Sequence, residues 1–108
     1  MITVSKSAAT QIEFSARQGG IENAVMRVAV RKLEDGSFHY ALGFDDNIGP
    51  QDVEFKSQGI NLVASPDTLD LGRELTVDFV ELDSGERNFI FINPLDPNCS
   101  VPRDPTSD

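Results

Sequence analysis

The stretch from Val25 to Phe44 constrains the fold more than any other part of this sequence. Apolar and polar residues alternate through it on both sides of a short polar centre, Asp35-Gly36, which is the pattern of two antiparallel strands joined by a hairpin turn. Gly suits such a turn because it adopts a positive φ without a Cβ clash. Each strand gains one apolar face, formed by Met26, Val28 and Val30 on the first and by Phe38, Tyr40, Leu42 and Phe44 on the second. A two-stranded ribbon is marginal in water, so the rest of the chain has to cover these faces.

The remaining segments predict one long helix, one short helix and several strands. Apolar residues at helical spacing follow a Ser5 or Ser7 N-cap and stop at Gly19-Gly20, which predicts about three helical turns. Ser65-Pro66 starts a short helix that ends before Gly72. We expect strands near 2–4, 53–55, 60–64, 75–82 and 88–93, the last in the centre of a sheet because both of its faces are apolar. The acidic segment 45–52 lacks calcium-loop spacing and predicts a solvated turn.

These elements predict an α+β domain that is mostly β, with two packed sheets and one N-terminal helix. The length of 108 residues suits a single domain. We place that domain at residues 1–100 and a flexible, Pro-rich, acidic tail at 101–108.

The net charge of −9 excludes charge-driven binding to nucleic acid or to an anionic membrane surface. No segment approaches the ~20 apolar residues of a membrane span, and the N-terminus lacks the regions of a signal peptide. We therefore expect a cytoplasmic protein.

The sequence offers little for catalysis. Its single cysteine, Cys99, and its single histidine, His39, form the only nucleophile and base pair to consider. Cys99 lies in a Pro-rich segment, and His39 points away from the face of Phe38 and Tyr40. Gly19-Gly20 ends a helix and does not open one, so a phosphate loop is not indicated either. We expect that the protein is not an enzyme.

Four segments resemble, in order and spacing, the A-type iron-sulfur carriers of the IscA/HesB family. They are ITVSKSAATQI, MRVAVRKLEDGSFHYALGF, LTVDFVEL and FIFINP before a cysteine. The strongest parts of the match are Val-Arg with the later Tyr-x-Leu-x-Phe, the triplet Asp78-Phe79-Val80, and Asn93-Pro94. The resemblance runs from Ile2 to about Cys99 and implies a HesB-like sandwich.

The same resemblance implies three ligand positions, at which this sequence departs from the family. Family members have one hairpin cysteine, four residues after the Arg of Val-Arg, and a Cys-Gly-Cys tail that together bind iron or a cluster, commonly across a dimer. The corresponding residues here are Asp35, Cys99 (after a one-residue gap) and Val101. Thiolates select iron-sulfur clusters, so losing two of three removes the basis for binding one. We expect no cofactor and no metal site.

The resemblance therefore predicts a non-enzymatic IscA-like protein with a regulatory or protein-interaction role. The loss of cysteines and the acidic, Pro-rich end resemble the DsrR-like branch, which is encoded with the proteins of dissimilatory sulfur oxidation. We expect a protein partner, a monomer or weak dimer, and a contact surface that includes Glu34, Asp35, Gly36 and Cys99. The alternative is a degenerate iron or iron-sulfur carrier that uses Cys99 and Asp35 across a dimer, and a small-ligand binding module is a third hypothesis.

Overall fold

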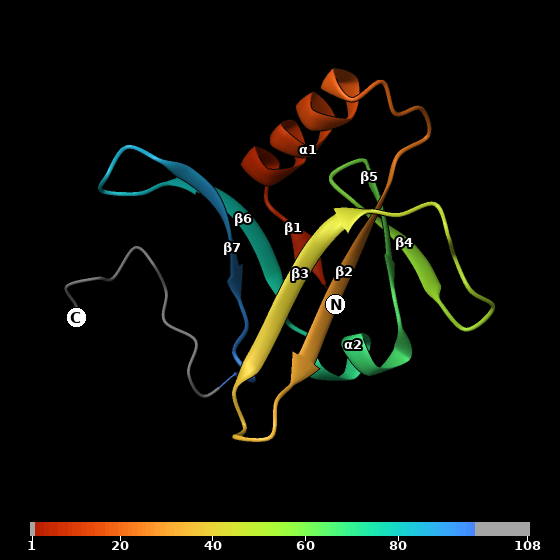
Figure 1. Ribbon diagram of the computed structural model, residues 1–108, viewed down its shortest axis with the longest axis vertical. Helices are drawn as coiled ribbons and strands as arrows, with labels where there is room; N and C mark the ends of the chain where they lie inside the picture. Colours follow the sequence, from red (N-terminus) through yellow and green to blue (C-terminus); the bar gives the residue numbers. More distant parts are fainter. Residues whose placement is uncertain (1, 97–108) are drawn as a thin grey trace.

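Two β-sheets and two helices make up the computed structural model, which describes residues 2–96 (Figure 1). The first sheet has the strand order β1-β6-β7, with β1 at Thr3–Val4, β6 at Thr76–Glu81 and β7 at Arg87–Ile92. The second has the order β3-β2-β5-β4, with β3 at Phe38–Phe44, β2 at Val25–Lys32, β5 at Ile60–Ala64 and β4 at Val53–Ser57. The α+β class, the two sheets and the N-terminal helix are confirmed. The expected domain boundary at residue 100 and the tail at 101–108 lie outside the described residues.

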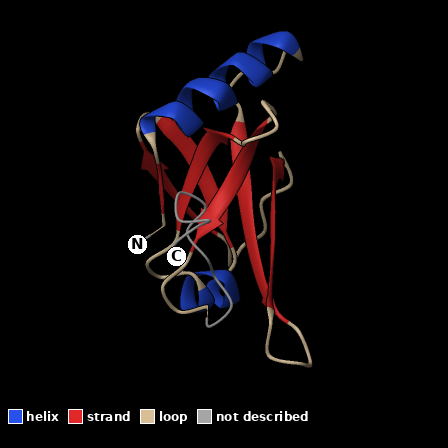
Figure 2. Ribbon diagram, turned by 90° about the vertical axis from the view of Figure 1, so that its left-hand side faces the viewer, coloured by secondary structure: helices blue, strands red, loops and turns tan. Residues whose placement is uncertain are grey.

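The two helices lie at opposite ends of the strands (Figure 2). Helix α1 spans Lys6–Gln18 and packs on β6 and β5, whereas α2 spans Pro66–Leu71 and packs on β2. The Ser5 hydroxyl accepts a hydrogen bond from the Ala8 amide at 3.1 Å, and Ser65 caps α2 in the same way. The buried side chains of α1 are Ala9, Ile12 and Ala16, which form the predicted apolar stripe, together with Ala8.

The predicted hairpin is β2 and β3. Met26 lies opposite Phe44, Val28 opposite Leu42 and Val30 opposite Tyr40, so the two apolar faces join as expected. The turn occupies Glu34, Asp35 and Gly36, with the Leu33 amide donating to the Ser37 carbonyl at 2.7 Å. Gly36 has φ = +88°, the left-handed conformation that glycine adopts without strain.

The expectation that residues 88–93 form a central strand is wrong. Within the described residues β7 pairs only with β6 and is the edge of its sheet. Phe89 and Phe91 pack against the core, and Ile90 and Ile92 on the other face are half-buried. Apolar residues on both faces therefore indicate that both faces of the strand are at least partly buried. They do not indicate whether the strand pairs with one neighbour or with two.

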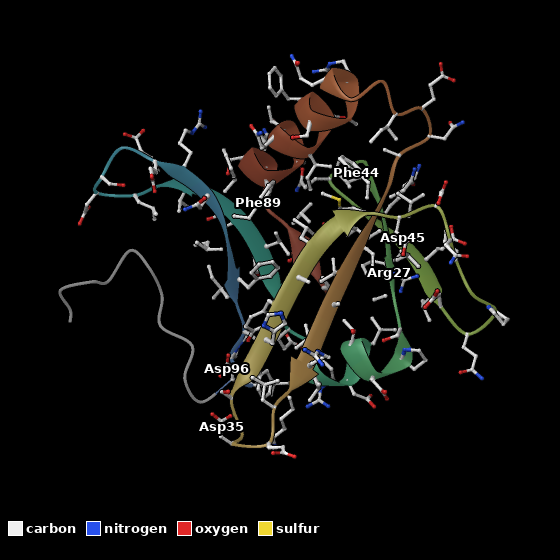
Figure 3. All side chains as sticks on the ribbon, viewed as in Figure 1. Arg27, Asp35, Phe44, Asp45, Phe89 and Asp96 are labelled. Atoms are coloured by element: carbon white, nitrogen blue, oxygen red, sulfur yellow. The ribbon has the colours of Figure 1, made fainter. Side chains whose placement is uncertain are left out.

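The acidic segment 45–52 is also more than a solvated turn. It connects β3 and β4, which lie at opposite edges of the four-stranded sheet. Arg27 on β2 donates to Asp45 Oδ2 at 2.5 Å and to both carboxylate oxygens of Asp52 at 3.1 and 2.7 Å. Figure 3 shows Arg27 and Asp45 close together beside β2. The segment is thus tied to the sheet at both of its ends.

Candidate functional site

The hairpin tip, defined as Glu34, Asp35 and Gly36, lies at the end of the molecule opposite α1 (Figures 1 and 3). Glu34 and Asp35 are exposed. Asp35 Oδ1 accepts two hydrogen bonds from Ser37, one from its hydroxyl at 2.6 Å and one from its amide at 2.9 Å. These bonds, the hydroxyl first, lower the pKa of Asp35. One oxygen of this carboxylate therefore already stabilises the turn.

The exit segment, residues 93–96, holds the end of the described chain against the hairpin. Asn93 is fully buried, and its Nδ2 donates to the Leu71 carbonyl at 3.0 Å while its Oδ1 accepts from the Leu95 amide at 3.1 Å. The Tyr40 hydroxyl on β3 donates to Asp96 Oδ2 at 2.6 Å, and the Tyr40 ring stacks on Phe91 of β7 with centroids 5.1 Å apart. The last described residue, Asp96, is thus held beside β3.

Cys99 and Val101, the other two residues at family ligand positions, lie outside the described residues. Cys99 follows Asp96 by three residues in the sequence. Figure 3 shows Asp35 and Asp96 at the same end of the molecule. The last described residue therefore lies at the end of the molecule that carries the hairpin tip.

The contact between Tyr40 and Asp96 was not predicted from the sequence. The sequence places Tyr40 on the apolar face of its strand and Asn93 in an Asn-Pro pair, but 56 positions separate Tyr40 from Asp96. A single acidic residue after Asn-Pro-Leu is a weak signal by itself. A buried Asp is unusual enough to attract attention only once its 8% exposure is known.

Other donor groups do not gather into a site within the described range. Residues 2–96 contain no cluster of three His, Cys, Asp or Glu side chains able to hold a metal ion. His39 is exposed on β3 opposite Arg31, and its predicted partner Cys99 is outside this range, so the pair is not tested. Over the same residues, no helix has the length and apolar character needed to cross a bilayer.

No model of a protein family matches the chain. The iron-binding protein IscA of Escherichia coli is 32% identical over 94 residues, which cover 86% of this chain and 85% of that protein. A protein of Aquifex aeolicus is 30% identical over 91 residues, covering 84% of this chain and 78% of the relative.

Two crystal structures share the fold. The structure of IscA with the [2Fe-2S] cluster superposes with a TM-score of 0.72 at 28% identity, covering 87% of this chain and 86% of the other. Escherichia coli SufA, which is involved in the biosynthesis of iron-sulfur clusters, gives a TM-score of 0.73 at 26% identity, covering 93% and 86% of the two chains. Together with the identity to IscA over most of both sequences, this shows that the chain belongs to the IscA/SufA-like family of A-type iron-sulfur carrier proteins, with the HesB-like fold.

Proposed function

We propose that this protein keeps the carrier fold as a surface for protein contact and has lost the family's means of holding a cluster. The observation that carries the proposal is the donor set at the hairpin tip. The position that the resemblance assigns to the first thiolate holds Asp35, and one oxygen of that carboxylate is occupied by Ser37. With one cysteine in the whole chain, a second thiolate is not available from the same molecule.

The proposed contact surface combines the hairpin tip with Cys99. The exposed Glu34 and Asp35 offer two carboxylates that a basic partner surface can meet. The bond from Tyr40 to Asp96 supports this surface because it ties the start of the Cys99 region to the hairpin. Through these residues the protein acts as a partner-binding factor and not as an enzyme.

The narrower proposal is a regulatory role in dissimilatory sulfur oxidation, as in the DsrR-like branch. It is supported by the two substituted ligand positions and by the acidic, Pro-rich end of the sequence. Neighbouring genes for sulfite-reductase-like and sulfur-relay proteins are the expected genomic context. An operon for iron-sulfur assembly in that place contradicts the regulatory role.

Three further proposals complete this description. The chain divides into a domain at 1–100 and a tail at 101–108, so a protein that ends at residue 100 is expected to unfold at the same urea concentration as the full chain. The protein is a monomer or weak dimer, which sedimentation velocity at two concentrations tests. It works in the cytoplasm, which fractionation of the native cell tests.

The second candidate function is a degenerate carrier, with iron or a [2Fe-2S] cluster as its cargo. The family membership favours it, since IscA has been crystallised with such a cluster. Two chains related by a two-fold axis supply two Cys99 thiolates and two Asp35 carboxylates, a harder donor set than the family's thiolates.

Anaerobic reconstitution with ferrous iron and sulfide, followed by visible absorption and analysis of iron and labile sulfide, separates the two functions. We expect the protein to emerge colourless, with iron at the level of Cys99→Ser. A cluster present in fixed proportion to protein, and absent from Cys99→Ser, refutes the first function and supports the second.

A further inference from the structure

A groove of about 690 Å³ lies between α1 and the strands β6 and β7, away from the hairpin tip. Its wall on the helix side includes Lys6, Thr10, Gln11 and Phe14, and its wall on the sheet side includes Phe79 and Arg87. The groove is more apolar than polar, although it is open to solvent. It is therefore distinct from the site proposed above.

The sequence of α1 explains why this side of the helix is available. Lys6, Thr10 and Phe14 are four residues apart and share one stripe, while Ile12 and Ala16 belong to the buried stripe. Phe14 is 49% exposed, the largest exposed fraction among the large apolar side chains of the described range. About half of this side chain stays open to solvent, and with the apolar lining of the groove it forms a contiguous apolar surface, the kind of surface that marks interaction sites.

The sheet side of the groove adds a second aromatic surface. Phe79 on β6 lies opposite Phe89 on β7, and their ring centroids are 4.8 Å apart. Figure 3 shows Phe89 below the first turn of α1. The Arg87 guanidinium lies 5.0 Å from the centroid of the Phe79 ring, within the range of a cation–π interaction. This interaction holds the cation at the groove.

The charged side chains that line the groove are both cations, although the lining residue Ser7 donates to the Asp78 carboxylate at 3.0 Å. The chain has 18 acidic and 9 basic residues, yet the residues that line the groove include Lys6 and Arg87 and no carboxylate. Glu81 is opposite Arg87 in the ladder, but within the described residues neither cation forms an ion pair. Two unpaired cations beside two aromatic surfaces fit an acidic ligand with an apolar side chain.

We propose that this groove docks an acidic segment of a partner protein. The segment inserts an apolar side chain between Phe14 and Phe79 and places its carboxylates against Lys6 and Arg87. A second copy of this chain is disfavoured as the occupant because two molecules of net charge −9 repel each other. This inference rests on the protein-contact function proposed above and adds a second partner surface to it. The two can fail separately, because cluster reconstitution tests the opposite end of the molecule.

The test is a titration of the full-length, ¹⁵N-labelled protein with the blocked acidic pentapeptide EDFDE, followed by amide chemical shifts. We expect shifts confined to α1 and to the β6 and β7 residues of the groove. Binding is expected to weaken when NaCl is raised from about 0.05 to 0.5 M, because salt screens exposed charges. The peptides EDADE and KKFKK test the aromatic ring and the charge separately, and both are expected to bind more weakly than EDFDE.

Matched variants locate the interaction. Arg87→Glu is expected to weaken EDFDE binding by about fivefold or more, whereas Arg73→Glu, which makes the same charge change outside the groove, leaves it within about twofold. Phe14→Ser alters an exposed side chain, so its fold is checked by circular dichroism before the same titration. Equal affinity of EDFDE and KKFKK, or equal loss in Arg73→Glu and Arg87→Glu, overturns the proposal. A dimer in sedimentation velocity that Phe14→Ser dissociates also overturns it, because a second copy is then the occupant.

Discussion

The Thr68 hydroxyl is expected to contribute strongly to the stability of this fold, because it completes the hydrogen bonding of β2. The ladder between β2 and β5 ends where Arg27 lies beside Val63, so β5 does not reach Val30. The Val30 amide instead donates to Thr68 Oγ1 at 3.1 Å, and the Ser65 hydroxyl lies 3.2 Å from the same oxygen. Thr68 is 3% exposed, so water does not replace this acceptor.

Thr68→Val keeps the shape of the side chain and removes the acceptor. A buried donor left without a partner costs about 1–3 kcal/mol, so we expect the free energy of unfolding to fall by about 2 kcal/mol. For a domain of this size that corresponds to a lower melting temperature by roughly 8–16 °C. Equilibrium urea unfolding, followed by circular dichroism, measures the loss.

Thr68→Ser is the matched control, because it keeps the hydroxyl and removes one methyl group. Burial of that group accounts for about 0.8 kcal/mol, so the serine variant should lie between the wild type and Thr68→Val. Hydrogen exchange at the Val30 amide adds a local readout and should accelerate by more than tenfold in Thr68→Val alone. If Thr68→Ser loses as much stability as Thr68→Val, packing of the methyl group is the cause and the argument from the hydroxyl is refuted.

Three further predictions concern the acidic segment, the exit segment and the ligand positions. Hydrogen bonds from Arg27, and then from the Gly49 amide, lower the pKa of Asp52 to about 2, and Arg27 also lowers the pKa of Asp45. Both pKa values lie below those of the unfolded chain, so this contribution to stability is present above about pH 4 and is lost as the pH falls toward 2. Urea unfolding from pH 6 to pH 2 should therefore show a steeper acid loss in the wild type than in Arg27→Gln, and parallel curves contradict it. Tyr40→Phe should lower the free energy of unfolding by about 1–2 kcal/mol and speed hydrogen exchange at the Leu95 and Asp96 amides. Unchanged stability and exchange would show that the bond to Asp96 is unimportant. The variant Asp35→Cys/Ser100→Gly/Val101→Cys should gain a coloured cluster on reconstitution, and failure to do so shows that more than the ligands has been lost.

Much of the fold was predictable because periodicity and turn chemistry are local properties. Alternation over Val25 to Phe44 predicted the hairpin and its apolar faces, and Gly36 predicted the turn, whereas the register became known only from the structure. Ser65 predicted where α2 begins, and of the two caps that the sequence offered for α1, Ser5 and Ser7, the structure uses Ser5. The position of β7 at the sheet edge was not predictable in this way, because alternation describes the faces of a strand and contains no information on its edges.

The candidate site illustrates the same division. The identities of Asp35, Cys99 and Val101, and the supply of one thiol per chain, can be read directly from the sequence. Three features join residues that are 18 to 65 positions apart: the bond of Tyr40 to Asp96, the ion pairs of Arg27 with Asp45 and Asp52, and the groove between Phe14 and Phe79. Such contacts depend on strand order and on how the sheets and α1 pack. The local sequence therefore accounts for the elements and the available donors, and only the packing of those elements brings distant side chains within bonding distance of one another.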